Sequence, residues 1–275
     1  MSSGTFYAIC RHLHRIDDDS AQSNPMVRQW NCTPIIQTTY RHNPYLGNLP
    51  NRIIDDLKNH AKYRGMIRRI FVSPFLRCMQ TALYLANQLD IDMITVDYRL
   101  AEFGRAIDPM RTDGTLSLTQ IFDQSMEYID QMARSTGSRS TGSRSMGSRS
   151  TETTTAPFDH HNVISDDDIE IFRSILYDDR GIERIKIVSD GQTLESINFN
   201  ESMDEYSARL RNAIQSLQSD GTLFVTHSGG MLWKNPNRWM RYNVMYFYPT
   251  ADSNPPVGSS LRYPSNKQIY MTLNI

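Results

Sequence analysis

Short apolar segments alternate with amphipathic segments along this chain, and this alternation constrains its fold more than any other feature. The apolar segments predict buried strands at 5–10, 69–72, 93–96, 184–188 and 222–225, with later strands at 242–248 and 268–273. Between them, apolar residues spaced three or four apart predict helices at 50–65, 116–132, 166–177 and 202–217. The same spacing predicts a further helix that begins directly after Ser73-Pro74. Strands that alternate with helices predict an α/β fold, a three-layer α/β/α sandwich with a mainly parallel central sheet.

The sequence before the helix that follows Ser73-Pro74 predicts how this helix begins. Serine is a favoured capping residue and proline is tolerated in a first turn, so Ser73-Pro74 is expected to cap this helix. Its apolar residues then share one face, at Met79, Ala82, Leu83, Ala86 and Leu89.

Polar side chains stand where two of the predicted strands end. Cys10-Arg11-His12 follows the first apolar segment, and His227 follows the segment 222–225. In parallel sheets, ligands bind at the carboxyl ends of the strands. We therefore expect His12 and His227 to meet in space.

Residues 134–149 repeat the pattern RSTGS with a period of five, and no acidic residue falls between 134 and 151. Segments so rich in glycine, serine and threonine cannot bury a core, which predicts a disordered insert at about 134–157 within a single domain, 1–275. The alternative is a basic arm that contacts nucleic acid or is phosphorylated on its Arg-Ser pairs. Its arginines are Arg134, Arg139, Arg144 and Arg149.

Composition narrows the class of protein. The chain has 275 residues, 39% of them hydrophobic, and a net charge of -1, so no overall field draws it to nucleic acid or to a membrane surface. Its cysteines, Cys10, Cys32 and Cys78, are sparse and lack the CxxC spacing, which favours the reducing cytosol over a disulfide framework. Neither a signal peptide nor an apolar run of about 18 residues is found, so we expect a cytoplasmic protein without a membrane partner.

Several of these segments carry the residue types that phosphoryl transfer through a histidine requires. Neutral imidazole is a good nucleophile near pH 7, guanidinium groups hold phosphate oxygens in pairs, and a carboxylic acid can protonate the departing oxygen. The chain supplies them at Arg11-His12, at Arg77, at Glu102 in Leu100-Ala101-Glu102, and at His227 in Val225-Thr226-His227. No P-loop and no GxGxxG motif is present, and no cofactor is implied.

These motifs, in this order, resemble those of the histidine phosphatase superfamily, which has the phosphoglycerate mutase-like fold. Arg11-His12 matches its Arg-His-Gly motif, and residues 73–82 resemble its Ser-Pro-x-x-Arg-x-x-Gln-Thr-Ala segment. Leu100-Ala101-Glu102 is similar to its acid motif, and residues 226–230 to the segment of its second histidine. The resemblance implies that His12 forms phosphohistidine, that Arg11 and Arg77 bind the phosphate, that His227 is a further phosphate ligand, and that Glu102 donates the proton.

Residues 11–17 most resemble the form of the motif in the phosphatase domain of ubiquitin-associated and SH3 domain-containing proteins, which Trp30 fits loosely. In that branch a second arginine reaches the phosphate, which implies this role for Arg15. Leu13 replaces the family's glycine, and a branched side chain there is expected to crowd the phosphate. His14 replaces a glutamate of that branch, and it is the second residue at which this chain differs from the motif.

Other interpretations of single residues stay open at this stage. Asp97 and Asp108 are rival acids to Glu102, and Arg15 is alternatively a salt-bridge partner of the acidic run 17–19. Asp159-His160-His161 lacks further ligands at suitable spacing and fits a surface loop better than a metal site.

The sequence thus predicts a metal-independent phosphatase that hydrolyses a phosphate monoester, on a small molecule or a phosphoprotein, through phosphohistidine. A mutase is less favoured, because no local sign of a water-excluding lid is found. The alternative from another class is an inactive pseudophosphatase that binds phosphorylated ligands as a scaffold, which Leu13 and the insert motivate. The substrate and the oligomeric state are left open.

Overall fold

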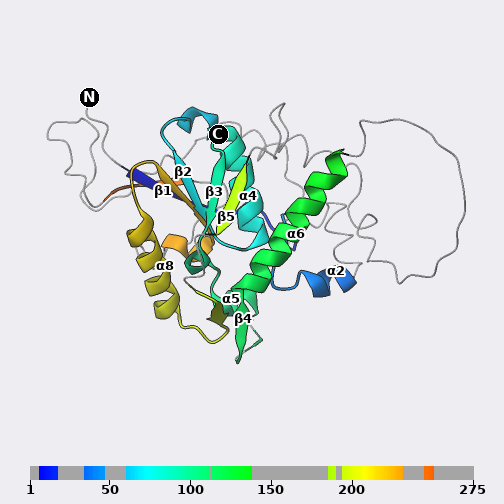
Figure 1. Ribbon diagram of the computed structural model, residues 1–275. Coiled ribbons are helices and arrows are strands. Elements are labelled where there is room, and N and C mark those ends of the chain that lie inside the picture. The colour runs from blue at the N-terminus through cyan, green and yellow to red at the C-terminus, as the bar shows by residue number, and fades with distance from the viewer. Residues whose placement is uncertain are drawn as a thin grey trace, which may run out of the picture.

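The computed structural model describes residues 6–17, 34–46, 60–108, 110–111, 113–137, 185–189, 194–231 and 245–250. Its main sheet has the strand order β5-β3-β2-β7-β1-β8 (Figure 1). The strands are β1 (Phe6–Arg11), β2 (Arg69–Val72), β3 (Met93–Val96), β5 (Lys186–Ser189), β7 (Thr222–Thr226) and β8 (Met245–Pro249). All neighbouring pairs are parallel except β1 and β8, which are antiparallel. The prediction of a mainly parallel sheet is confirmed.

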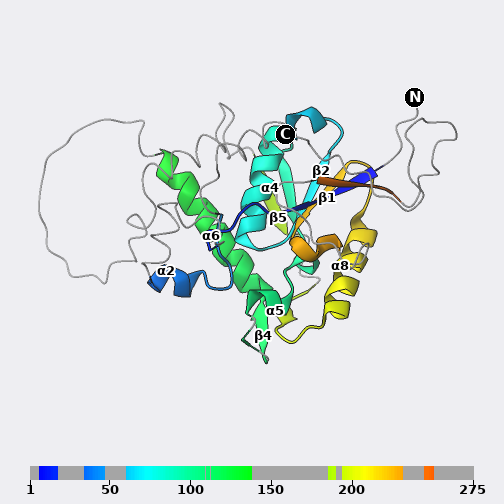
Figure 2. The ribbon, with the colours of Figure 1, turned by 180° about the vertical axis from the view of Figure 1, so that it is seen from behind.

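Helices cover both faces of this sheet. The helices α4 (Leu76–Leu89) and α6 (Leu118–Gly137) lie on one side, and α8 (Met203–Leu217) lies on the other (Figures 1 and 2). Strand β1 contributes side chains to the hydrophobic cores on both faces of the sheet. Ala8 and Cys10 pack in the first hydrophobic cluster, and Tyr7 and Ile9 pack in the second. The α/β/α sandwich is therefore built as the alternation of segments predicts.

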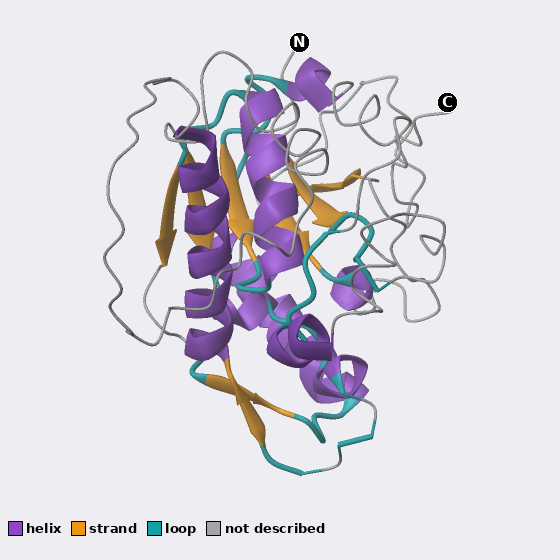
Figure 3. Ribbon diagram, turned by 90° about the vertical axis from the view of Figure 1, so that its right-hand side faces the viewer, coloured by secondary structure: helices purple, strands orange, loops and turns teal. Residues whose placement is uncertain are grey.

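The remaining described elements are short. They are α2 (Pro34–Thr39), α5 (Gly104–Ile107), the 3-10 helices η2 (His60–Tyr63), η3 (Tyr98–Leu100) and η6 (Ser228–Met231), and the strands β4 (Thr115–Ser117) and β6 (Ser196–Asn198). The last two form an antiparallel pair set apart from the main sheet (Figure 3). None of the described helices is long and apolar enough to cross a membrane.

The ends of the long helices differ in how they are capped. At α8, Ser202 and Glu205 form a reciprocal capping box, which suits the Ser-x-x-Glu sequence. At α4 the predicted cap is wrong, because the N-cap residue is Phe75 and no side chain of its own caps the helix. Instead, the amide of Leu76 donates to Oδ1 of Asn43 at 2.7 Å, a residue distant in sequence. Ser73 instead bonds to Nε2 of His227, at 2.8 Å.

The predicted helix 116–132 needs correction at both ends. It begins only at Leu118, because residues 115–117 pair with β6 as a strand. It then continues to Gly137, so the first residues of the arginine repeat, 134–137, are helical rather than disordered. Ala133 and Arg134 are good helix formers, whereas Ser135, Thr136 and Gly137 are weaker ones, and the helix ends at this glycine.

Several predictions fall outside the described residues. These are the helix at 166–177, the strand at 268–273, most of the helix at 50–65, Trp30, Cys32, the group 159–161, and the repeat arginines Arg139, Arg144 and Arg149. Cys10 and Cys78 are described, and both are buried free thiols.

Candidate active site

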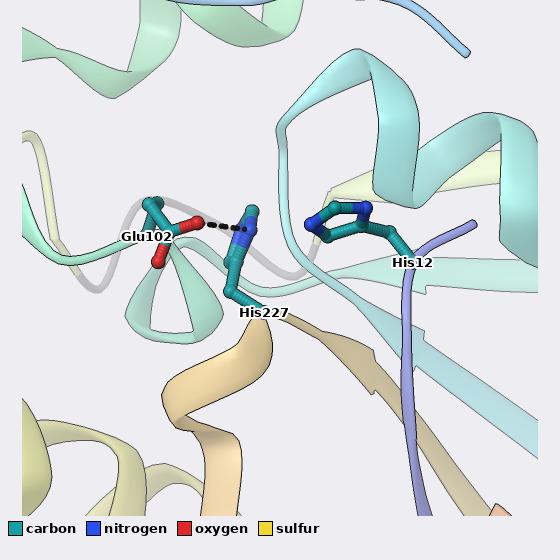
Figure 4. A group of neighbouring side chains, drawn as sticks. All are labelled: His12, Glu102 and His227. Carbon is teal, nitrogen blue, oxygen red and sulfur yellow. Dashed lines mark ion pairs between the residues drawn. The ribbon is translucent and has the colours of Figure 1, made fainter. Parts of the chain in front are cut away.

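His12 and His227 meet at the carboxyl ends of β1 and β7. The two strands pair in parallel, with Arg11 opposite Thr226, and the amide of His12 extends the pairing by donating to the Thr226 carbonyl at 3.0 Å. The ring centroids of the two histidines lie 5.4 Å apart (Figure 4). The topology of the sheet thus brings together the two residues that were predicted to meet.

The hydrogen bonds of His12 orient its ring. Nδ1 lies 2.6 Å from the carbonyl oxygen of Leu13, and since a carbonyl only accepts, Nδ1 carries the proton. The lone pair is therefore on Nε2. Burial, then the positive charge of Arg77, holds the pKa of His12 well below its usual value. His12 is therefore a neutral imidazole at pH 7, with its lone pair on Nε2.

His227 is held between a carboxylate and a hydroxyl. Its Nδ1 lies 2.9 Å from Oε2 of Glu102, and its Nε2 lies 2.8 Å from Oγ of Ser73 (Figure 4 shows the carboxylate contact). Burial lowers the pKa of His227 to about 4, although Glu102 opposes this shift. The neutral ring donates from Nδ1 to Glu102 and accepts at Nε2 from Ser73.

Glu102 is an ionised carboxylate in the free protein. Burial by itself would raise its pKa, but His227, through its charge and its hydrogen bond, and Arg77 outweigh burial and hold the pKa well below its usual value. The backbone amide of Phe103 also donates to Oε1, at 3.1 Å. Of the three candidate acids, Glu102 is the one in contact with His227.

The rival carboxylates have other partners. Asp97 accepts from the backbone and the side chain of Arg99 at the start of η3, and Asp108 pairs with Arg41 at 3.1 Å. Both contacts are typical of structural roles.

Arg77 is a buried cation, and some of its hydrogen-bond donors have no acceptor among the described residues. Its Nη2 lies 3.3 Å from Oε2 of Glu102 and 3.3 Å from Nδ1 of His227. Its Nε and Nη1 are also buried, and neither has a hydrogen-bond partner among the described residues. Buried donors without partners are costly, so this guanidinium is suited to a bound anion.

The other two arginines lie nearby. The charge of Arg11 contributes to the lowered pKa of both His12 and His227. Arg15 forms a two-pronged ion pair with Asp17, the alternative that the sequence left open. Its charge also contributes to a lowered pKa of Arg77, after burial, so Arg15 lies on the same side as the site.

The side chain of Leu13 belongs to the core of the protein. The side chain is fully buried in the first hydrophobic cluster, and the amide donates to Oγ1 of Thr81 at 3.0 Å. Asp90 is the one described non-glycine residue with positive φ, so the backbone at Leu13 needs no glycine. The burial of this side chain argues against the expected crowding of a bound phosphate, which stays a prediction.

His12, Glu102 and His227 each offer one possible ligand atom, and these three atoms lie within 4.8 Å of one another. Such a set resembles a metal site. However, Nη2 of Arg77 is 3.3 Å from the very donors of Glu102 and His227, and a guanidinium stays charged. Together with the nearby Arg11, this charge opposes a cation and favours an anion.

Ser73 is a site residue whose role the sequence misassigned. It lies in the motif that carries Arg77, but its spacing before a helix pointed to a cap. Its contact with His227 joins residues 154 positions apart, which no local pattern indicates.

No family model and no curated protein matches the chain. Among solved structures, the native structure of a mycobacterial glucosyl-3-phosphoglycerate phosphatase is similar, with a TM-score of 0.36 and 12% sequence identity. The alignment covers 88% of this chain and 89% of that one. At this TM-score we draw no inference about function from the likeness.

Proposed function

We propose that this protein is a metal-independent phosphatase that hydrolyses a phosphate monoester through phosphohistidine. The observation that carries the proposal is a neutral His12, with its lone pair on Nε2, beside a buried Arg77 that has donors without partners among the described residues. The motif resemblance to the histidine phosphatase superfamily, and to the ubiquitin-associated and SH3 domain-containing branch in particular, supports the same proposal.

In the first step, Nε2 of His12 attacks the phosphorus atom and the bond to the leaving oxygen breaks. That oxygen takes the proton of Glu102, which must therefore be protonated when the substrate is bound. Arg11 and Arg77, with Arg15 beside them, balance the charge on the other phosphate oxygens. Once Glu102 is protonated, it no longer needs the Nδ1 proton of His227, and that N–H bonds a phosphoryl oxygen instead.

Glu102 gains this proton on substrate binding. A phosphate dianion next to the carboxylate, which also competes for Arg77, raises the pKa of Glu102. Substrate binding therefore takes up a proton from solvent, and the neutral His12 stays competent as nucleophile because its own pKa is low.

In the second step, water attacks the phosphorus atom of phosphohistidine. Glu102, now a carboxylate, takes the proton of the water, the P–N bond breaks, and its electron pair returns to Nε2 of His12. Glu102 is now protonated, and it returns this proton to solvent as inorganic phosphate leaves, which restores the starting form of the enzyme. The order of events makes Glu102 first the acid and then the base.

The test is turnover of p-nitrophenyl phosphate by the purified chain with EDTA present. We expect chelator-resistant hydrolysis that His12→Ala reduces by at least about 1,000-fold, because the nucleophile is lost. Rapid quenching in alkali with phosphorus-labelled substrate should trap an acid-labile protein phosphate in the wild type and none in His12→Ala. Hydrolysis that survives His12→Ala unchanged would rule out this mechanism.

One observation favours a second function, that of a pseudophosphatase that binds phosphorylated ligands without turning them over. Glu102 is held as a carboxylate by His227 and Arg77, which is the wrong protonation state for an acid. Vanadate binding measured by calorimetry separates the two functions. Binding that His12→Ala weakens, with no turnover of any ester across about pH 5 to 8, would establish the scaffold.

A further inference from the structure

Arg209, on α8, reaches from its helix to the segment that carries Glu102. Its Nη1 donates to the carbonyl oxygens of Arg99 and Ala101 at 2.8 and 3.0 Å, and its Nη2 donates to the carbonyl of Glu102 at 3.3 Å. We call residues 99–102 the acid segment. One guanidinium thus accounts for three of its four carbonyl groups.

The guanidinium of Arg209 is itself fixed from other directions. Glu201 pairs with it through both oxygens, Oε1 to Nε and Oε2 to Nη2, each at 2.8 Å. The ring of Tyr206 lies beneath it, 5.1 Å from ring centroid to Cζ. The side chains of Arg209 and Glu201 are only 11% and 10% exposed, so this ion pair is shielded from solvent.

The acid segment needs such support, because η3 ends at Leu100 and the residues from Ala101 to Phe103 belong to no helix or strand. The remaining carbonyl, that of Leu100, accepts from Oγ1 of Thr226 at 3.0 Å. All four carbonyl groups of the segment are therefore bound by side chains from α8 and β7. One of these elements, β7, ends directly before His227.

We propose that Arg209 is a positioning residue that holds Glu102 in register with the leaving oxygen of the substrate. The inference rests on the proposed phosphatase function and goes beyond it. Glu102 contacts His227 at 2.9 Å and Arg77 at 3.3 Å, and a shift of its backbone breaks both contacts and moves the acid. Arg209 itself touches no reacting atom.

A misplaced acid has a kinetic signature that a general structural defect lacks. Proton donation matters most for a poor leaving group, such as an alkoxide, and least for p-nitrophenolate. We expect Arg209→Gln to lower kcat/KM by about 30-fold on an alkyl phosphate such as glycerol phosphate, and by less than about 3-fold on p-nitrophenyl phosphate. Arg209→Lys should fall between Arg209→Gln and the wild type, because one ammonium cannot serve all three carbonyl groups.

Two further variants give the largest and the smallest loss of kcat/KM with which Arg209→Gln is compared. Glu102→Gln gives the full effect of losing the acid, and its losses should show the same preference for the alkyl ester. Arg211→Gln makes the same substitution on an exposed residue of the same helix and should change neither ester's kcat/KM.

Folding is checked separately, because Arg209→Gln leaves Glu201 buried without its partner. The double variant Glu201→Gln, Arg209→Gln removes that charge and should keep the leaving-group preference with a higher melting temperature than Arg209→Gln. Equal losses on both esters in the folded double variant, or no loss on either, would overturn the inference. If the wild type hydrolyses neither ester, the proposed function itself fails, and Arg209 loses this role with it.

Discussion

Leu13 differs from the glycine of the family motif, and its surroundings in the fold explain what this residue does. Its side chain packs in the core, while its carbonyl orients His12 and its amide binds Thr81. We predict that Leu13→Gly destabilises the protein by about 3–5 kcal/mol and does not raise kcat/KM per folded molecule, because it empties a core position. Urea unfolding and turnover measure the two effects.

Leu13→Met is the matched control, since it preserves the volume and should cost less than about 1.5 kcal/mol. A Leu13→Gly variant that is stable and faster than the wild type would instead mean that this side chain obstructs the phosphate.

The protonation of Glu102 also belongs to the residue scale. Its pKa lies below the usual value in the free protein, so the protonated acid becomes scarcer as the pH rises, while His12 remains neutral. We predict that kcat/KM on an alkyl phosphate falls about tenfold for each pH unit above neutrality. Glu102→Gln should flatten this profile, and a wild-type profile that rises with pH would contradict the assignment of Glu102 as the acid.

Among the elements, α4 depends on a cap from outside itself. Asn43 accepts from the Leu76 amide, next to Arg77, and donates to Oγ of Ser125 on α6 at 2.9 Å. We predict that Asn43→Ala costs about 1–3 kcal/mol, because a buried amide loses its partner, and raises KM several-fold by loosening the turn that holds Arg77. Equilibrium unfolding and steady-state kinetics test both.

A matched control lies at the other end of the same helix. Asn87 is also buried, so Asn87→Ala is expected to affect stability without changing KM. Equal changes in KM for both variants would show that α4 responds as a whole rather than at its first turn.

For the whole molecule, the buried site couples folding to pH. His227 has a pKa of about 4 in the folded protein and an ordinary value of 6.5, so below about pH 6.5 the unfolded chain binds a proton that the folded one does not. The lowered pKa of His12 acts in the same direction, and that of Glu102 adds to the effect below its ordinary value of 4.5. We predict that stability is greatest above pH 6.5 and falls steadily as the pH drops toward 4.

Urea midpoints across this range measure the effect. His227→Gln should make the decline shallower, because that variant cannot take up the proton. A wild-type midpoint that stays constant from about pH 7 to 4 would show that these groups titrate alike in both states.

Much of the architecture could be predicted from sequence, and the failures have a common cause. The strands β1, β2, β3 and β7 and the helix α8 were expected, because their apolar spacing is local. The strand β4 was taken for helix because its partner β6 is far away in sequence, and Ser73 was taken for a cap because His227 is equally remote. The interpretation of Arg134, Arg139, Arg144 and Arg149 as a nucleic-acid-binding arm stays a prediction.

The sequence by itself determined the α/β alternation and the chemistry on offer, since residue type and spacing are properties of the chain. From the residues alone it left Asp97 and Asp108 open beside Glu102, and it gave no sign of Arg209. Only the tertiary structure placed Glu102 against His227 and Arg77 and brought Arg209 to the acid segment, and it alone determined the neutral state of His12 and His227. The reason is that pKa values and hydrogen-bond partners depend on burial and on charges brought together from β1, α4, η3 and β7, and both arise only when the chain is folded.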